Sequence, residues 1–149
     1  MAIIGIGNPM MADDGIGPRL ITELEGSHLG VDLIDMGTGG MQLVHVLAEY
    51  DAVLIIDSAD MDLAPGQFRI FSPEDVVSLK ETRAYSLHEW DLMRSIEISR
   101  NLGEAPDRIL ILAVQPRSLD MRDGLSPVLQ RLIPAYIEEV RKTVGLLRP

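Results

Sequence analysis

Apolar and polar residues recur along this chain with two different periods, one typical of strands and one typical of helices. Short continuous apolar runs predict strands over 2–6, 31–34, 52–57 and 108–114. Apolar residues spaced three and four positions apart predict helices over 16–26, over 41–50, around 92–96 and from 127 onward. Strands and helices therefore alternate in sequence, which is the pattern of an α/β domain.

The run AVLIID at 52–57 is apolar until its final aspartate, so it predicts a central strand buried on both faces of a parallel sheet. The turn signal at 64–66 follows, and the connection to 67–71 is too short for a helical crossover. We therefore predict an antiparallel edge strand over 67–71. The expected fold is three-layer α/β, with a mostly parallel, twisted sheet of about five strands and helices on both faces.

Two helices carry more specific predictions. The second helix, MQLVHVLAEY, is expected to turn one face inward, formed by Met41, Val44, Leu47 and Ala48. The terminal helix is expected to begin at Ser126-Pro127, with the serine hydroxyl as N-cap and the proline at the first helical position. Its inward residues follow helical spacing: Leu129, Leu132, Ile133, Tyr136, Ile137, Val140 and Val144.

Length and composition bound the class of protein. At 149 residues with 46% hydrophobic residues, the chain is expected to form a single domain, 1–149, around one core. Its net charge is 13 minus 23, or −10, which disfavours binding to nucleic acid or anionic lipid. It has no cysteine, which excludes disulfides and thiolate chemistry. No apolar stretch approaches the roughly 20 residues of a membrane span, and Met1 leads directly into a strand, so we expect a cytoplasmic protein without membrane insertion.

The stretch GIGNPMMADDGIG follows the first predicted strand and allows more than one interpretation. Gly5 and Gly7 begin a dinucleotide-binding pattern, but Met10 stands where the third glycine belongs. Asp13 and Asp14 would also repel a pyrophosphate. A purely structural interpretation makes one aspartate a helix N-cap and lets Gly15 and Gly17 pack a helix closely against the sheet.

A third interpretation treats the loops at one edge of the sheet as a single site. Ligands of an α/β sheet bind beyond the carboxyl ends of its strands. Asp14 follows the first strand, Asp57 ends the central strand and His88 opens a helical segment. Two carboxylates and an imidazole would form a three-ligand metal site with free coordination positions, suited to zinc or nickel.

Other polar residues near this edge are candidate substrate contacts. The first loop, the glycine-rich loop 35–40 and the end of the last strand are predicted to contact a bound substrate through Asn8, Gly37, Thr38, Gly39 and Gln115. His28 is predicted to be solvated, and His45 to be a packed or surface residue rather than a ligand. Ser58 has no nucleophile elbow or paired histidine, so local hydrogen bonding is its expected role.

Five sequence blocks carry a resemblance to a known family: GIGNPMMADDGIG at 5–17, DMGTGGMQLV at 35–44, LIIDSAD at 54–60, SLHEWDL at 86–92 and QPRSLDMRDGLSP at 115–127. In this order they closely resemble the hydrogenase maturation endopeptidases. These are cytoplasmic proteases that trim the carboxyl-terminal extension from the large subunit of nickel-iron hydrogenases. The blocks span almost the whole chain, so the resemblance applies to all of the predicted domain.

The resemblance implies a metal-ligand set. Family members place their ligands at the second acidic residue of the first block, at the aspartate ending the central strand and at the histidine of the fourth block. In this sequence these positions are Asp14, Asp57 and His88. Many relatives carry glutamate where this chain has Asp14, so Asp13 also stays open as the ligand. The nickel is expected to arrive bound in the substrate, and zinc or cadmium would substitute for it in crystals.

The resemblance also implies the activity of a monomeric endopeptidase whose partner is the nickel-loaded large-subunit precursor. Asp14 and Asp57 are the candidate catalytic residues, because either the metal polarises the scissile carbonyl or one carboxylate acts as general base. The family is grouped with the aspartic-type peptidases. Two alternatives stay open: a docking protein without hydrolysis, and peptidyl-tRNA hydrolase, which shares the GxGNP start but needs a basic RNA-binding face that does not fit the charge of −10.

Overall fold

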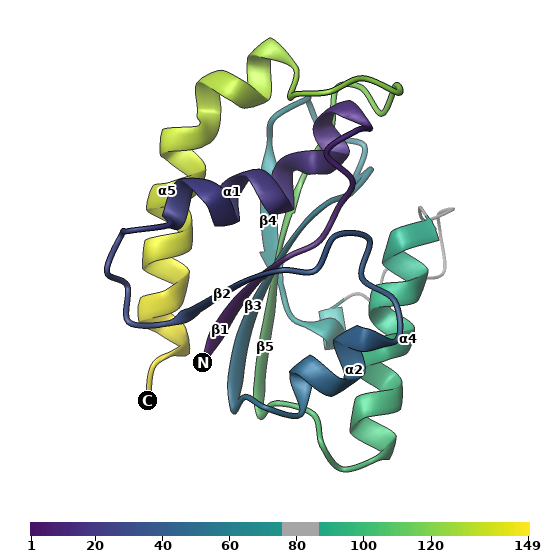
Figure 1. The fold of residues 1–149 in the computed structure, drawn as a ribbon, viewed down its shortest axis with the longest axis vertical. Helices are drawn as coiled ribbons and strands as arrows, with labels where there is room; N and C mark the ends of the chain where they lie inside the picture. The colour runs from purple at the N-terminus through teal and green to yellow at the C-terminus, as the bar shows by residue number, and fades with distance from the viewer. Residues whose placement is uncertain (76–86) are drawn as a thin grey trace.

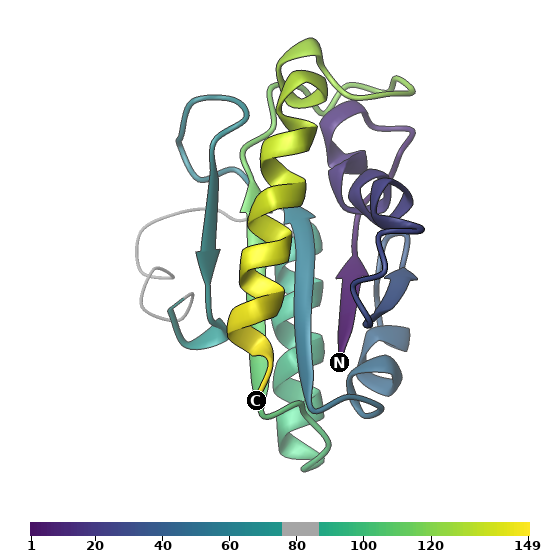
Figure 2. The same ribbon diagram turned by 90° about the vertical axis from the view of Figure 1, so that its left-hand side faces the viewer.

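The computed structural model describes residues 1–75 and 87–149, with side chains for 1–75 and 91–149. In chain order the elements are β1 (Ala2–Gly5), the 3₁₀ turn η1 (Ala12–Gly15), α1 (Ile16–Leu24), β2 (Asp32–Asp35), α2 (Gln42–Leu47), β3 (Ala52–Ser58), β4 (Phe68–Phe71), α4 (Leu87–Asn101), β5 (Arg108–Val114) and α5 (Pro127–Leu147). Figure 1 and Figure 2 show the sheet between two helical layers, with α1 and α5 on one side and α2 and α4 on the other.

Five strands form one sheet in the order β2-β1-β3-β5-β4. β1 pairs in parallel with β2 and β3, β3 pairs in parallel with β5, and β4 pairs antiparallel with β5 at the edge. The predicted mostly parallel sheet, with the 52–57 run at its centre and one antiparallel edge strand, is confirmed. Four strands therefore end at the same edge of the sheet, which we call the carboxyl edge.

The two faces of the central strand belong to different cores. Leu54 and Ile56 pack with α1 and α5 in one hydrophobic cluster, whereas Val53 and Ile55 pack with α2 and α4 in the other. Successive side chains of a strand point to opposite faces. Continuing this alternation, Asp57 belongs to the α2/α4 face of the sheet, and the next residue belongs to the α1 face.

The second helix is shorter than predicted, and its buried face is different. The prediction that Met41 and Ala48 turn inward was wrong: Met41 is 60% exposed and Ala48 is exposed as well. α2 begins only at Gln42, so Met41 stands at the N-cap rather than on the helix face. The buried stripe instead joins residues one turn apart, Leu43 and Leu47, with Val44 between them.

The terminal helix begins at Pro127 with Ser126 as its N-cap residue, as predicted. The Ser126 hydroxyl, however, makes no capping hydrogen bond, so that part of the prediction was wrong. The serine is anchored through its backbone instead, because its N–H donates to Asp13 Oδ1 at 2.6 Å. No helix within 1–75 or 87–149 is long and apolar enough to cross a membrane.

Tyr136 should make the stability of the domain fall at high pH. It is 1% exposed, and its hydroxyl donates to the Gly66 carbonyl at 2.6 Å. Burial, with a smaller contribution from the Asp13 carboxylate, raises the pKa of Tyr136 to about 12. The folded protein thus keeps a proton that the unfolded chain loses near pH 10, so the free energy of unfolding is expected to drop by roughly 2 to 3 kcal/mol between about pH 10 and 12.

The matched variant for this prediction is Tyr136→Phe, measured by urea unfolding from about pH 8 to pH 11.5. It is expected to cost about 1 kcal/mol at neutral pH, because the hydrogen bond to Gly66 is lost. Above about pH 10 it should lose less stability than the wild type, since it has no phenol to titrate there. Equal pH slopes in the two proteins would contradict the assignment to Tyr136.

Candidate functional site

The connections around β1 and β3 create a natural binding position. α1 carries the chain from β1 to β2 over one face of the sheet, and α2 carries it back past β1 to β3 over the other. In such sheets ligands bind in the crevice outside the carboxyl ends of the two strands where the winding reverses. In this domain the corresponding position lies between η1, which follows β1, and the end of β3.

The structure brings Asp14 of η1 and Asp57 of β3 into one hydrogen-bonded network. Both are buried, with 5% and 2% of the residue exposed. The Ser58 hydroxyl donates to Asp14 Oδ1 at 2.8 Å, and the Ser58 N–H donates to Asp57 Oδ1 at 2.8 Å. The Asn8 N–H donates to Asp14 Oδ2, also at 2.8 Å. Two carboxylates joined through Ser58 in this way bring negative charge to the carboxyl edge, where a cation would be attracted.

Ser58 is the site residue whose role the sequence reasoning missed. The sequence assigns it only local hydrogen bonding, whereas its hydroxyl reaches a carboxylate 44 positions earlier in the chain. The alternation of side chains in β3 was the available signal. Since Asp57 belongs to the α2/α4 face, its neighbour must face the layer of α1, where Asp14 lies.

The two adjacent aspartates have separate tasks. Asp13 is fully buried and points toward the segment between β5 and α5. Its oxygens accept three backbone N–H groups, from Arg117 at 2.8 Å and Ser118 at 3.1 Å on Oδ2 and from Ser126 at 2.6 Å on Oδ1. Asp14 alone shares a network with Asp57. The prediction that one aspartate caps the helix was wrong, because the N-cap of α1 is Gly15 and both carboxylates bond elsewhere.

Glycines allow η1 to approach the sheet this closely. A Cβ on Gly17 would lie 2.3 Å from the Ile6 carbonyl oxygen and 2.7 Å from the Ile56 carbonyl oxygen. Gly7 has a φ of 143°, and a Cβ there would lie 1.8 Å from the Asp14 carbonyl oxygen. The interpretation that a glycine packs the helix closely against the sheet is therefore confirmed for Gly17, whereas a Cβ on Gly15 would instead meet Pro9 Cα of the first loop at 2.8 Å. The close packing at Gly7 and Gly17 sets Asp14 at the carboxyl edge.

Two of the loops predicted to contact substrate meet beside Asp14. The Gly7 N–H donates to the Gly37 carbonyl at 2.6 Å, which joins the first loop to the glycine-rich loop 35–40. Asn8 uses its side-chain oxygen to accept the Met10 N–H at 3.0 Å. Thr38 is exposed, and Gly37 and Gly39 have positive φ angles of 53° and 77°. Contact of these residues with substrate stays a prediction.

Gln115 is 7% exposed and organises the loop that follows β3. Its Oε1 accepts the Met61 N–H at 2.7 Å and the Leu63 N–H at 3.2 Å, and its Nε2 donates to Asp60 at 3.1 Å. These bonds hold the loop beside Asp57, so the structure assigns the amide a role in shaping the edge. Direct contact of Gln115 with substrate stays a prediction.

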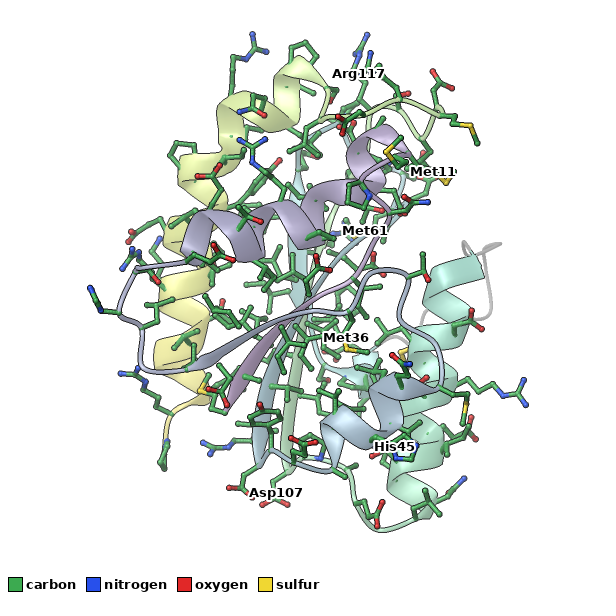
Figure 3. The ribbon with its side chains drawn as sticks, in the orientation of Figure 1. Met11, Met36, His45, Met61, Asp107 and Arg117 are labelled. Atoms are coloured by element: carbon green, nitrogen blue, oxygen red, sulfur yellow. The ribbon has the colours of Figure 1, made fainter. Side chains whose placement is uncertain are left out.

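The side chains of this edge are separate from the opposite end of the domain. Figure 3 shows Arg117 and Met11 toward the upper end of the molecule, Met61 below them, and His45 and Asp107 at the lower end. His45 and His28 are both exposed, as expected for residues that are not ligands.

The third predicted ligand, His88, lies outside the residues whose side chains the structure describes. It is the second residue of α4, and α4 leads to β5, which starts at the amino end of the sheet. The first turn of α4 therefore lies toward the carboxyl edge (Figure 1). Among the described side chains, no three histidine, aspartate or glutamate residues form a group that could hold a metal ion. The ligand set with His88 stays a prediction.

Known proteins match this chain along most of its length. The sequence model of the hydrogenase maturation protease family matches residues 18–143. The hydrogenase 2 maturation protease of Escherichia coli strain K12 is 32% identical over 142 residues, which cover 93% of this chain and 86% of that protein. The hydrogenase expression/formation protein HoxM of Cupriavidus necator is 32% identical over 149 residues, 97% of this chain and 72% of that protein. The solved structure of the hydrogenase maturating endopeptidase HybD from E. coli superposes with a TM-score of 0.84 at 29% identity, covering 97% of this chain and 91% of that chain.

Proposed function

Because the chain belongs to the hydrogenase maturation protease family, we propose that it removes the carboxyl-terminal extension from the large-subunit precursor of a nickel-iron hydrogenase. The enzyme is accordingly a hydrolase of the endopeptidase type. We further propose that nickel already bound in the precursor is the element it recognises, so that only a metal-loaded precursor is cut. The metal belongs to the substrate in this scheme.

The pairing of Asp14 and Asp57 through Ser58 is the observation that carries the proposal. Two carboxylates from different elements, joined at the position where α/β sheets bind ligands, are an uncommon arrangement unless a cation or a reaction requires them. Two buried carboxylates with no functional role would lower the stability of the fold, because each charge loses its hydration.

The donor set fits the proposed substrate. Carboxylate oxygens with an imidazole suit a borderline divalent ion such as nickel. Asp57 belongs to the sheet face covered by α4, whose first turn lies toward the carboxyl edge, and this supports His88 as the third ligand. Three protein ligands leave coordination positions for the groups by which the precursor holds its metal.

The chemistry divides between the substrate's metal and this chain. A divalent ion beside the scissile bond would polarise its carbonyl and acidify a bound water. Asp14 and Asp57 would orient that ion, and a carboxylate oxygen next to it would accept the proton of the attacking water. Asp14 and Asp57 therefore serve in both assignments. As ligands they orient the metal ion, and in an aspartic-type mechanism one of them accepts the proton of the attacking water.

Single-turnover mass spectrometry of purified precursor tests the proposal. Wild-type protein is expected to shorten the nickel-loaded precursor and to leave the nickel-free precursor intact. His88→Ala should abolish the cleavage while circular dichroism stays unchanged, because a ligand at the edge contributes little to the core. His45→Ala, at an exposed histidine of α2, is the matched control and should cleave normally.

Each other outcome has a defined meaning. Cleavage of the nickel-free precursor at an equal rate would contradict nickel recognition. A precursor mass that never changes, despite complex formation, would favour the docking protein without hydrolysis. The proposal includes a cytoplasmic, monomeric enzyme, and light scattering on a sizing column tests the monomer.

A further inference from the structure

The segment between β5 and α5, residues 115–126, is irregular and partly exposed, yet it is attached firmly to the turn that carries Asp14. Leu119 and Met121 on it are 42% and 89% exposed. Its attachment consists of hydrogen bonds to Ala12 and Asp13, two consecutive residues of η1. Such a concentration of contacts needs an explanation, because these residues are not themselves at the reacting position.

The attachment uses both the side chain and the backbone of η1. The buried carboxylate of Asp13 accepts N–H groups at both ends of the segment, from Arg117 and Ser118 on one oxygen and from Ser126 on the other. The Asp13 N–H also donates to the Ser118 carbonyl at 3.1 Å, and the Ala12 N–H donates to the Arg122 carbonyl at 2.8 Å. Asp13 thus works as a clamp between η1 and the 115–126 segment.

The turn depends on this clamp more than an ordinary helix would. η1 is a single 3₁₀ turn, Ala12–Gly15, and Ala12 adopts a φ of 49°, a conformation that side chains other than glycine rarely take. A short turn with a strained residue persists only when its surroundings hold it in place. Asp14 lies in the same turn, so its position relative to Ser58 and Asp57 depends on that support.

We propose that Asp13 is a positioning residue for Asp14: its carboxylate clamps the 115–126 segment to η1 and thereby holds Asp14 at the place where it acts. The inference rests on the proposed function for its effect on cleavage, but its structural part stands independently. An aspartate is required because both oxygens must accept. An asparagine has one acceptor oxygen, and its NH₂ group would face a backbone N–H.

Amide hydrogen exchange in Asp13→Asn tests the structural part without any substrate. The Asn8 N–H bonds to Asp14 Oδ2 and therefore reports the position of Asp14. We expect exchange at Asn8 to rise about tenfold or more together with exchange at Ser118, while the amide of Ile4 in β1 keeps its wild-type rate. If Ser118 alone loses protection and Asn8 does not, Asp13 only anchors the segment and the proposal is overturned.

Kinetics on the nickel-loaded precursor test the catalytic part. In Asp13→Asn, kcat is expected to fall about 10- to 100-fold with KM unchanged within about twofold, because a misplaced carboxylate affects the reacting geometry rather than docking. Asp123→Asn removes an exposed carboxylate from the same segment and is the matched control, expected to keep wild-type kcat and KM. A folded Asp13→Asn with wild-type kcat would overturn the proposal.

If Asp13→Asn does not fold, Asp13→Ser is compared with the wild type in the same exchange and kinetic measurements. The serine hydroxyl is smaller than the carboxylate and still offers an acceptor oxygen. Failure of the wild type to cleave would contradict the proposed protease function alone, since the exchange measurement still decides whether Asp13 positions Asp14. The two failures are therefore distinguishable.

Discussion

Asp57→Asn is expected to slow cleavage of the nickel-loaded precursor by about 100-fold or more without loss of the fold. Asparagine has nearly the same shape, and its side-chain oxygen can still accept the Ser58 N–H that now bonds to Asp57 Oδ1. What disappears is the negative charge at the carboxyl end of β3. Both roles considered for Asp57, metal ligand and general base, need that charge.

The same variant separates these two roles. If Asp57 is chiefly a ligand for the substrate's nickel, the affinity for the loaded precursor should fall together with the rate. If it is chiefly the general base, binding should persist while kcat falls. Single-turnover rates and a binding isotherm, measured on one protein preparation, give both quantities.

Asp51→Asn is the matched control, because Asp51 is exposed and precedes β3 at its opposite end. It removes the same charge next to the same strand, at its amino end, and should leave the rate unchanged. Cleavage by Asp57→Asn at the wild-type rate would show that cleavage does not need the charge at the carboxyl edge. Cleavage by Asp51→Asn as slow as that by Asp57→Asn would show that the slower rate is not specific to this edge.

Gly17→Ala is expected to destabilise the domain by about 3 kcal/mol or more, or to prevent folding. The first turn of α1 approaches the sheet so closely that a Cβ there would lie 2.3 Å from the Ile6 carbonyl oxygen and 2.7 Å from the Ile56 carbonyl oxygen. Both obstacles are backbone atoms, one directly after β1 and one in β3, so no side chain can rotate away. The whole helix would have to move, and η1 with Asp14 would move with it.

For Gly145→Ala, at another glycine of the chain, we expect the opposite change in stability. Gly145 is exposed within α5, and a Cβ there would meet nothing within 4 Å. The substitution should stabilise the protein by about 0.5 to 1 kcal/mol, because alanine loses less conformational freedom in a helix. Urea unfolding at neutral pH compares both variants with the wild type. A Gly17→Ala protein as stable as Gly145→Ala would contradict the close-packing explanation.

Most of the architecture was readable from local periodicity. The apolar run 108–114 corresponds residue for residue to β5, and the run ending at Asp57 proved to be the central strand. Boundaries were less certain, since β2 spans Asp32–Asp35 instead of 31–34. The inward face predicted for α2 was partly wrong at Met41 and Ala48, because apolar character alone does not say where a short helix begins.

Local periodicity did not predict the roles of adjacent polar residues. Asp13 and Asp14 are the same amino acid in the same turn, yet one bonds to the 115–126 segment and the other to Ser58. Gln115 likewise acts on the loop after β3, more than 50 positions before it in the chain. Nothing in the neighbouring sequence distinguishes these tasks.

By itself, the sequence determined the order of strands and helices, the parallel sheet and the edge at which Asp14 and Asp57 emerge. These properties follow from short-range periodicity and from the rule that parallel strands end at one edge. Only the tertiary structure decided that Ser58 joins the two carboxylates, that Asp13 clamps a distant segment, and that Gly17 must lack a side chain. The physical reason is that hydrogen-bond partners and steric limits are set by atoms brought together from far apart in the chain, which no local pattern encodes.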